Sequence, residues 1–559
     1  MIDYRAPIDD LLFALRYAAE AERLPGWDGE LAAAVLNEAG RLIDQEIAPL
    51  DPIGDTTPAR LEGGRVKMAP AFVTAYHAFR DGGWPGLAME ERFGGQGLPH
   101  VLASAVSEML SGACISFQMV LSLGQGAMRT LAVNGSPEQK ARWLPGLASG
   151  QWLATMCLTE PQAGSDLGLI RSLASPTAAS PTAEGGWSIA GSKIFISGGD
   201  QDLTGRQLHL VLARTPDMPP GVKGLSLFLC PSEFEDGSRN GVSVLRLEEK
   251  MGMHASPTCQ MAFDGARAEL IGRPGEGLAR MFTMMNAERM DVAVQGIGLA
   301  EVAGQRARAY AGQRRQGRSG PAGAALINTH ADVRRMLLTQ MALSLGCRAM
   351  AYRTLVELEL GERPALVEFL TPVCKAFATD AAVEAAQAAI QVHGGYGYLR
   401  EYRVEQILRD GRITQIYEGT NGIQGMTVAG RLLRLDGGAC AHAFRDHLEE
   451  SVGFAAAAGL DATAAALERT VDAWDLAVAA MLGQTEIGYT AQALLRLAGL
   501  ATFGAAWARL EAAAERAPQP ARIRVLADFV RRWMLPEAIH LATLCRSGFV
   551  AAAGDEVFG

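Results

Sequence analysis

The sequence has few cysteines, and their spacing excludes the common uses of paired thiols. The eight cysteines lie far apart along 559 residues, with no CxxC pair and no cysteine–histidine spacing suited to zinc. We therefore expect buried, reduced thiols, as in a cytoplasmic protein, and no metal site.

Positive charge is also scarce. The 61 Asp and Glu outnumber the 51 Lys and Arg, which gives a net charge of -10. Such a chain is poorly suited to nucleic acid or an anionic membrane as its main partner, and we expect neither. The N-terminus, MIDYRAPIDDLLFAL, lacks the basic and apolar regions of a signal peptide. We expect no apolar run long enough to span a bilayer elsewhere in the chain.

The length and the order of local patterns predict several domains, because 559 residues are too many for one core. Helical periodicity dominates at first, short β-rich runs such as QLHLVLA and GLSLFLCP follow, and Ala-rich helical stretches fill the rest. No strand leads into GxGxxG and a helix, which argues against a Rossmann site. We predict an α+β multidomain fold with an N-terminal helical domain (1–150), a middle antiparallel β-barrel or sheet domain (151–272), a four-helix bundle (273–436) and an additional C-terminal helical domain (437–559).

One helix start is well marked in the first helical region. In GSPEQKARWL, Ser136 is a natural N-cap and Pro137 fits the first helical position. We therefore expect a helix to begin at this point.

Four stretches combine side chains and glycines in ways that suit a bound ligand. MCLTEPQAGSDLG (156–168) runs from a strand-like start into a loop of N–H and hydroxyl groups, although an ordinary connection is equally possible. SKIFISGGD (192–200) sets an aromatic beside a hydroxyl, which suits a planar ring or simply a core Phe. QVHGGYGYLREYRVEQILRDGRI (391–413) interrupts a helical pattern with glycines, which indicates close backbone approach or an αL turn. In RITQIYEGTNGIQ (412–424), the carboxylate of Glu418 is either part of a surface turn or a base held in an apolar slot.

Together and in this order, the four stretches resemble the acyl-CoA dehydrogenase family of flavoproteins. The likeness covers about Asn37 to Leu435, and its most specific marks are TEPxAGSD, HGGYGY…RDGRI…IYEGT and the helix with YAxxRxQGR. The extended N-terminus and the extra C-terminal helices resemble the longer branch that includes the 3-methylmercaptopropionyl-CoA dehydrogenases. The resemblance implies FAD as cofactor, an acyl-CoA substrate, an electron-transferring flavoprotein as acceptor, a role in fatty acid β-oxidation, and a homodimer or homotetramer.

The resemblance also implies which carboxylate acts as the base. Glu418 stands at the position of the carboxylate that removes the proton next to the thioester carbonyl, while a hydride passes to flavin N5. Its backbone N–H would polarise the thioester oxygen, and Gly419 would let the acyl chain pass close to the backbone. Glu288 stands where other family members place the base, but it also reads as an ordinary helix glutamate neutralised by Arg289. We prefer Glu418 because the whole RITQIYEGT context is present.

Further contacts follow from the same resemblance. Two departures from the family pattern are Gln162, where Gly is common, and His330, where Gln is frequent and to which we carry no cofactor role. The implied contacts are Met156, Leu158 and Thr159 at the flavin ring, Phe195 and Ser197 against the isoalloxazine, Arg314 and Gln316 at the pyrophosphate and adenine, Gln391 and Gly395 from a second subunit, Thr420 and Gly422 closing over the cofactor, and Ser165 and Arg289 at the CoA portion.

Two alternative functions remain open on this architecture. One is a flavin oxidase that uses O₂, and the other is a DNA-associated alkylation-stress flavoprotein. The second needs a basic face, for which RIRVLADFVRRW (522–533) is the one candidate, and this run also suits a solvated amphipathic helix. The acyl group, whether 3-methylmercaptopropionyl or short- or medium-chain, is not specified by the residues.

Overall fold

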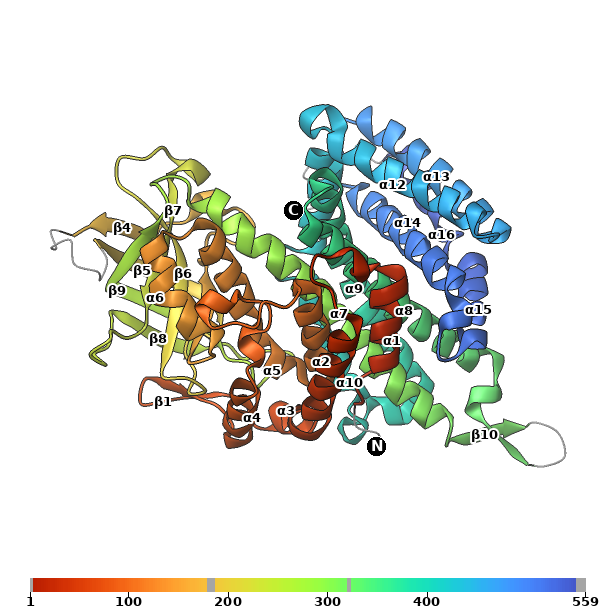
Figure 1. The fold of residues 1–559 in the computed structure, drawn as a ribbon, viewed down its shortest axis with the longest axis horizontal. Helices are drawn as coiled ribbons and strands as arrows, with labels where there is room; N and C mark the ends of the chain where they lie inside the picture. Colours follow the sequence, from red (N-terminus) through yellow and green to blue (C-terminus); the bar gives the residue numbers. More distant parts are fainter. Residues whose placement is uncertain (1–3, 178–185, 319–322, 549–559) are drawn as a thin grey trace, which may run out of the picture. The chain divides into compact units, whose positions relative to one another are not determined.

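The computed structural model describes residues 4–177, 186–318 and 323–548 of the chain (Figure 1). These residues form two compact units, Glu38–Asp291 and a second unit that joins Met1–Asn37 to Val292–Gly559. The helices are α1 Ile8–Phe13, α2 Gly29–Leu42, α3 Leu50–Thr56, α4 Pro70–Asp81, α5 His100–Asn134, α6 Pro137–Ala148, α7 Gly277–Ala311, α8 Ala331–Leu360, α9 Pro364–His393, α10 Val404–Gly411, α11 Asn421–Met426, α12 Ala439–Ala457, α13 Asp461–Leu482, α14 Ala491–Ala512, α15 Pro520–Phe529 and α16 Glu537–Ser547. The strands are β1 Arg60–Glu62, β2 Arg65–Lys67, β3 Trp152–Cys157, β4 Leu173–Pro176, β5 Trp187–Ser197, β6 Arg206–Arg214, β7 Leu225–Pro231, β8 Val242–Leu247, β9 Thr258–Ile271, β10 Arg315–Arg318 and β11 Ala324–Leu326. The predicted fold class is confirmed.

Strands β3 to β9 form the sheet of the Glu38–Asp291 unit. The pairings run β6–β4–β5–β9–β7 and return to β6, so that the sheet closes on itself as a barrel, with β3 added to β6 and β8 to β9. The pairings are antiparallel, as predicted, except that β3 and β4 run parallel to β6. Strands β6 and β7 are buried on both faces, which explains their continuous apolar sequences.

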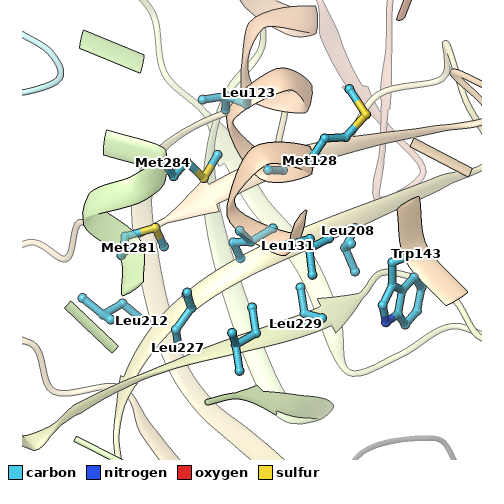
Figure 2. Packing of buried hydrophobic residues seen from close by; sticks show 14 of the residues in the cluster. Leu123, Met128, Leu131, Trp143, Leu208, Leu212, Leu227, Leu229, Met281 and Met284 are labelled. Carbon is cyan, nitrogen blue, oxygen red and sulfur yellow. The ribbon is translucent and has the colours of Figure 1, made fainter. Parts of the chain in front are cut away.

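Alternate residues of β6 and β7 enter different cores. Leu208 and Leu212 of β6 and Leu227 of β7 pack with side chains of α5 and α7 such as Leu131 and Met284 (Figure 2). The residues between them, including Val211 and Phe228, enter a separate cluster. This period of two is what a strand covered on both faces requires, and each fully buried side chain contributes about 1.5–3 kcal/mol.

Helix α6 begins as the sequence predicts. The hydroxyl of Ser136 accepts a hydrogen bond from the backbone N–H of Gln139 (3.2 Å), and the Gln139 side chain accepts one from the N–H of Ser136 (3.0 Å). Pro137 occupies the first turn. This reciprocal pair satisfies two otherwise unpaired donors of the helix end.

Helix α5 contradicts the expectation that no segment is long and apolar enough to span a bilayer. Among the described residues it alone passes this test, with a window of 18 residues whose mean hydropathy is 1.4. However, 89% of that window is buried inside the fold. Core burial therefore accounts for the apolar run, as it does for the central helix of many folded domains.

Glycines allow close helix packing in the other unit. A Cβ on Gly296 of α7 would lie 2.6 Å from the carbonyl oxygen of Ala378 in α9, and one on Gly346 of α8 would lie 2.3 Å from the rings of Phe503 and Trp507 in α14. Helix α14 is buried along most of its length, and α12, α13, α14 and α16 pack on one another in a bundle (Figure 1). The extra C-terminal helices therefore continue the core of α8 and α9.

Ion pairs tie the N-terminal residues to these same helices. The carboxylate of Glu20 accepts hydrogen bonds from Arg353 of α8 (2.5 Å) and from Arg509 of α14. Asp10 pairs with both terminal nitrogens of Arg522 in α15 (2.8 and 2.9 Å). Figure 1 shows α1 beside α8. The short helical segment Ala14–Ala18, which follows α1, contacts both α8 and α14. The extended N-terminus and the extra C-terminal helices thus stabilise each other.

The cysteines are buried and unpaired, as the sequence predicts. All eight lie in the described residues, and all are buried and free of disulfides. Burial raises the pKa of Cys157 to about 11 and that of Cys374 to about 12, so both are protonated thiols at neutral pH.

Candidate functional site

A buried ion pair organises the loop that follows β3. The ammonium of Lys193, on β5, donates to the carboxylate of Glu160 (2.9 Å) and to the carbonyl oxygens of Leu158 (2.9 Å) and Leu212 (2.8 Å). The Lys193 side chain has no exposed surface, and that of Glu160 is 4% exposed. Three acceptors match the three N–H donors of the ammonium, so this lysine fixes the path of the backbone at Leu158.

The carboxylate of Glu160 is satisfied from several directions. It accepts the backbone N–H groups of Arg171 (2.7 Å) and Ser172 (3.0 Å) and the side-chain amide of Gln162 (2.6 Å). Burial raises the pKa of Glu160, but the charge of Lys193 and these hydrogen bonds outweigh it and lower the pKa to about 2. Gln162, which departs from the family pattern, thus stabilises this loop through its hydrogen bond to Glu160.

The loop meets the end of β5, so the structure brings two of the predicted stretches together. The backbone N–H of Ile194 donates to the carbonyl oxygen of Thr159 (2.9 Å). Phe195 has a left-handed backbone, with φ of 59°, and the residue is 61% exposed. Met156 and Ser197 are half-buried, Met156 next to the last residue of β3 and Ser197 at the last residue of β5. An exposed aromatic on a strained strand end suits contact with a flat ligand.

The predicted CoA contacts and the alternative base lie in the same unit. Ser165 is exposed in the loop after β3, and Arg289 of α7 donates to the side chain of Asn286 (3.1 Å). Glu288 is 3% exposed, and one of its carboxylate oxygens lies 2.2 Å from where a Cβ on Gly126 of α5 would be. The absence of a side chain at residue 126 therefore makes room for this buried carboxylate.

The unit that contains Val292–Gly559 holds a cavity of about 440 Å³. Arg314 and Gln316 line it from the segment after α7, Gln391 lines it from the last turn of α9, and Gly395 lines it from the segment after α9. The structure thus brings these four predicted residues together within one chain. His330 also lines the cavity and donates from Nε2 to the carbonyl oxygen of Gln316 (2.8 Å).

Aromatic side chains to which the sequence analysis assigned no contact line the same cavity. Tyr310 and His393 stack with ring centroids 4.2 Å apart, and the Arg314 guanidinium lies 5.3 Å from the ring centroid of Tyr396. Burial lowers the pKa of His393, which keeps the imidazole neutral. Tyr310 lies at the end of α7, and Arg314 follows three residues after that helix ends.

Glycines leave one wall of the cavity open. Gly394 has φ of 60°, and no atom lies within 4 Å of where a Cβ on Gly394 or Gly395 would be. A Cβ on Gly397 would instead lie 2.3 Å from the carbonyl oxygen of Ile390. The predicted close backbone approach is confirmed at Gly397, while the other two glycines form a cradle that side chains would fill.

Glu418 lies in a strained turn of this unit. Its φ is 54° and that of Gly419 is 84°, and the side-chain amide of Gln424 donates to both carbonyl oxygens (3.0 and 3.2 Å). Thr420 caps α11 by accepting the N–H of Ile423 (3.2 Å), and Gly422 lies near the side chain of Gln492. The hydroxyl of Tyr417 donates to the side chain of Gln295.

Backbone strain marks the predicted site residues. Among the described residues, seven that are not glycine have positive φ, and two of these are Phe195 and Glu418. A left-handed backbone costs such a residue about 1–3 kcal/mol and persists where surrounding contacts impose it. Strain at both residues is typical of groups held for a ligand.

Known protein families match the helical, β and helical parts of the chain in turn. Sequence models described as acyl-CoA dehydrogenase N-terminal, middle and C-terminal domains match residues 33–151, 155–266 and 275–433. The 3-methylmercaptopropionyl-CoA dehydrogenase of Ruegeria pomeroyi is 43% identical over 473 residues, which cover 80% of each chain. The broad-specificity linear acyl-CoA dehydrogenase FadE5 of Mycobacterium tuberculosis is 33% identical over 79% of this chain and 77% of its own. This chain belongs to the acyl-CoA dehydrogenase family, whose members are flavin-dependent oxidoreductases.

Solved structures agree on the fold. Caenorhabditis elegans ACDH-11, solved in complex with C11-CoA, superposes with a TM-score of 0.78 at 23% identity and covers 95% of this chain and 92% of its own. Butyryl-CoA dehydrogenase from Megasphaera elsdenii gives a TM-score of 0.63 at 26% identity over 74% of this chain and all of its own. The first match includes the additional C-terminal helices, and the second covers a smaller share of the chain.

Proposed function

We propose that this protein is an FAD-dependent acyl-CoA dehydrogenase in which Glu418 is the base. Glu418 takes the proton from C2 of the acyl group, a hydride leaves C3, and a C2–C3 double bond forms to give the 2-enoyl-CoA. FAD, when bound, accepts that hydride. The observation that carries this proposal is the strained Glu418–Gly419 turn, whose two carbonyl oxygens are both held by Gln424. A base fixed in this way requires little reorganisation during the reaction.

Other residues of the chain bind and orient the reactants. The Lys193–Glu160 pair holds the loop that would lie against the flavin ring, with Phe195 and Ser197 beside it. Gly419 leaves room for the acyl chain, and Ser165 and Arg289 would contact CoA. The backbone N–H of Glu418 would donate to the thioester oxygen as negative charge develops there.

The cavity near Arg314 fits the adenosine diphosphate half of FAD. Its volume of about 440 Å³ suits part of a dinucleotide rather than all of it. The guanidinium suits a diphosphate, the stacked Tyr310 and His393 offer an aromatic wall, and the glycine cradle admits a close approach. Arg314, Gln316, Gln391 and Gly395 would hold the cofactor from one subunit, which is consistent with a flavin shared across a homodimer or homotetramer.

Replacing Arg314 by leucine is expected to weaken FAD binding about 10–100-fold, because a charge-assisted contact to phosphate contributes about 1.5–3 kcal/mol. Quenching of flavin fluorescence on titrating apoprotein measures the affinity. The matched control is Arg315→Leu, since Arg315 is exposed and donates to the carbonyl oxygen of Ala324 outside the cavity. Equal losses in both variants would show that Arg314 does not contact the cofactor.

The proposed substrate rests on the named activities of similar proteins. The Ruegeria pomeroyi relative is a 3-methylmercaptopropionyl-CoA dehydrogenase, and its match extends into the additional helices, so we propose that thioester or a short- or medium-chain acyl-CoA. We propose an electron-transferring flavoprotein as the acceptor. Anaerobic addition of 3-methylmercaptopropionyl-, butyryl-, octanoyl- and palmitoyl-CoA to the FAD-loaded protein tests the proposed substrate. Bleaching of the flavin by one class, with a product two hydrogens lighter, supports the proposal, and absence of bleaching by all four contradicts it.

Two further observations distinguish the alternative functions. Rapid reoxidation of the reduced protein in air would identify an oxidase. A DNA-associated role would need a basic face at 522–533, but the arginines there are paired with carboxylates. Arg522 pairs with Asp10, Arg524 with Glu515, Arg531 with Glu511 and Arg532 with Asp528.

A further inference from the structure

A buried lysine touches the loop that carries Glu418. Lys375 lies in the middle of α9 and has no exposed surface. Its ammonium donates to the carbonyl oxygen of Gly419 (2.9 Å) and to the side-chain oxygen of Asn421 (2.9 Å). The chain contains six lysines, and this is the only one after Lys250. A buried ammonium is costly, so its retention here needs a reason.

A second residue of α9 holds the other end of the same loop. The carboxylate of Asp380 accepts hydrogen bonds from the side chains of Gln415 (2.6 Å) and Asn421 (2.8 Å). Asn421 also donates to the hydroxyl of Thr379 (3.1 Å). Burial raises the pKa of Asp380, and these hydrogen bonds and the charge of Lys375 oppose that rise. The segment 415–421 is therefore fastened to α9 on both sides of Glu418.

The contacts act on the backbone on which Glu418 depends. Because a trans peptide is planar, the direction of the Gly419 carbonyl sets the orientation of that peptide plane. Lys375 and Gln424 both donate to this oxygen from different helices. Gln424 also donates to the carbonyl oxygen of Glu418, so the peptide planes on both sides of Gly419, whose φ is 84°, are held next to the left-handed turn at Glu418. Without the ammonium, the turn loses one of the contacts that offset its strain.

We propose that Lys375 is a positioning residue for Glu418, a role that rests on the proposed function. It does not touch the acyl group; it holds the Gly419 carbonyl and thereby places the carboxylate and the N–H of Glu418 for proton abstraction. A single ammonium reaches both the carbonyl of Gly419 and the amide of Asn421, whereas a planar guanidinium is bulkier and differently shaped. Displacement of a reacting group by about 1 Å lowers rates about 100-fold, which sets the size of the expected effect.

The test isolates proton abstraction from hydride transfer. An acyl-CoA analogue with sulfur in place of C3 has an acidic C2 proton but no hydride to give, so deuterium uptake at C2 in D₂O reports the base alone. In the FAD-loaded Lys375→Met variant we expect deuterium uptake and kcat, each per bound flavin, to fall about 10–100-fold, with KM changed by less than about threefold. The matched control is Lys223→Met, because Lys223 is exposed in the other unit.

A second variant keeps the inference testable if Lys375→Met fails to fold. Gln424→Met removes the other donor to the Gly419 carbonyl, together with the donor to the Glu418 carbonyl, while leaving Lys375 in place, and a fall per bound flavin at least as large is expected. A merely structural role predicts less folded or flavin-loaded protein but a normal rate for the part that is loaded. Wild-type rates per flavin in loaded Lys375→Met overturn the proposal, as do wild-type rates in loaded Gln424→Met where Lys375→Met does not fold.

The proposed function and the role of Lys375 are contradicted by different results. If the wild-type protein neither exchanges the C2 proton nor is bleached by any acyl-CoA, the proposed function is wrong, and the role of Lys375 falls with it. If the wild type is active and the loaded variants match it, only the role of Lys375 is wrong.

Discussion

Replacing Glu418 by glutamine is expected to lower the rate of flavin bleaching by acyl-CoA about 10²–10⁴-fold, the usual contribution of a positioned general base. Glutamine keeps the size of the side chain and its hydrogen-bonding capacity but cannot accept the C2 proton. The strained turn should survive, because its contacts through Gln424 and Lys375 use backbone oxygens. Anaerobic stopped-flow absorbance measures the rate, and circular dichroism with flavin content shows whether the fold is intact.

The competing carboxylate provides the comparison. Glu288 is buried against Gly126 in the Glu38–Asp291 unit, and Glu288→Gln should leave bleaching largely intact because the base is elsewhere. The assignment is overturned if Glu418→Gln keeps full activity while Glu288→Gln loses it. Deuterium uptake at C2 of the sulfur analogue checks the same point without hydride transfer.

Much of the fold follows from local patterns, and the exceptions have physical causes. The continuous apolar run of β6 and the cap at Ser136 are local properties, and both were predictable. The apolar run in α5 was overlooked because local composition does not distinguish a buried core helix from a membrane span. The pairing of Glu20 with Arg353 joins residues more than 300 positions apart, which no periodicity specifies.

Some residues of the candidate site could be located from the sequence, and the residues that support them could not. Phe195, Arg314 and Glu418 stand in specific sequence stretches, so the resemblance to the family is enough to locate them along the chain. Their supports cannot be located in this way, because a buried lysine such as Lys193 or Lys375 looks like any other lysine until its acceptors are known. The identity of those acceptors, mostly backbone oxygens, depends on the tertiary fold.

Replacing Lys193 by methionine is expected to destabilise the Glu38–Asp291 unit by about 3–5 kcal/mol, because it leaves the Glu160 carboxylate buried without its cation. At about 2–4 °C per kcal/mol, Tm should fall by about 6–20 °C. The loop that follows β3 should also become more mobile, because the carbonyl oxygen of Leu158 loses its hydrogen-bond donor. Differential scanning calorimetry of the apoprotein measures the first effect, and flavin affinity measures the second.

Two control variants show whether the loss of stability comes from breaking the buried Lys193–Glu160 pair or from removing any lysine. Lys67→Met removes a half-exposed partner of Asp202 and should cost no more than about 1 kcal/mol. The double variant Lys193→Met with Glu160→Gln should recover part of the loss, because no buried charge remains. Since the pKa of Glu160 is about 2 in the fold and 4.5 as its ordinary value, its ionised form stabilises the wild type fully above pH 4.5. The difference in Tm between wild type and Lys193→Met should therefore persist at neutral pH and shrink as the pH falls from 4.5 towards 2, and a difference independent of pH would contradict the ion-pair account.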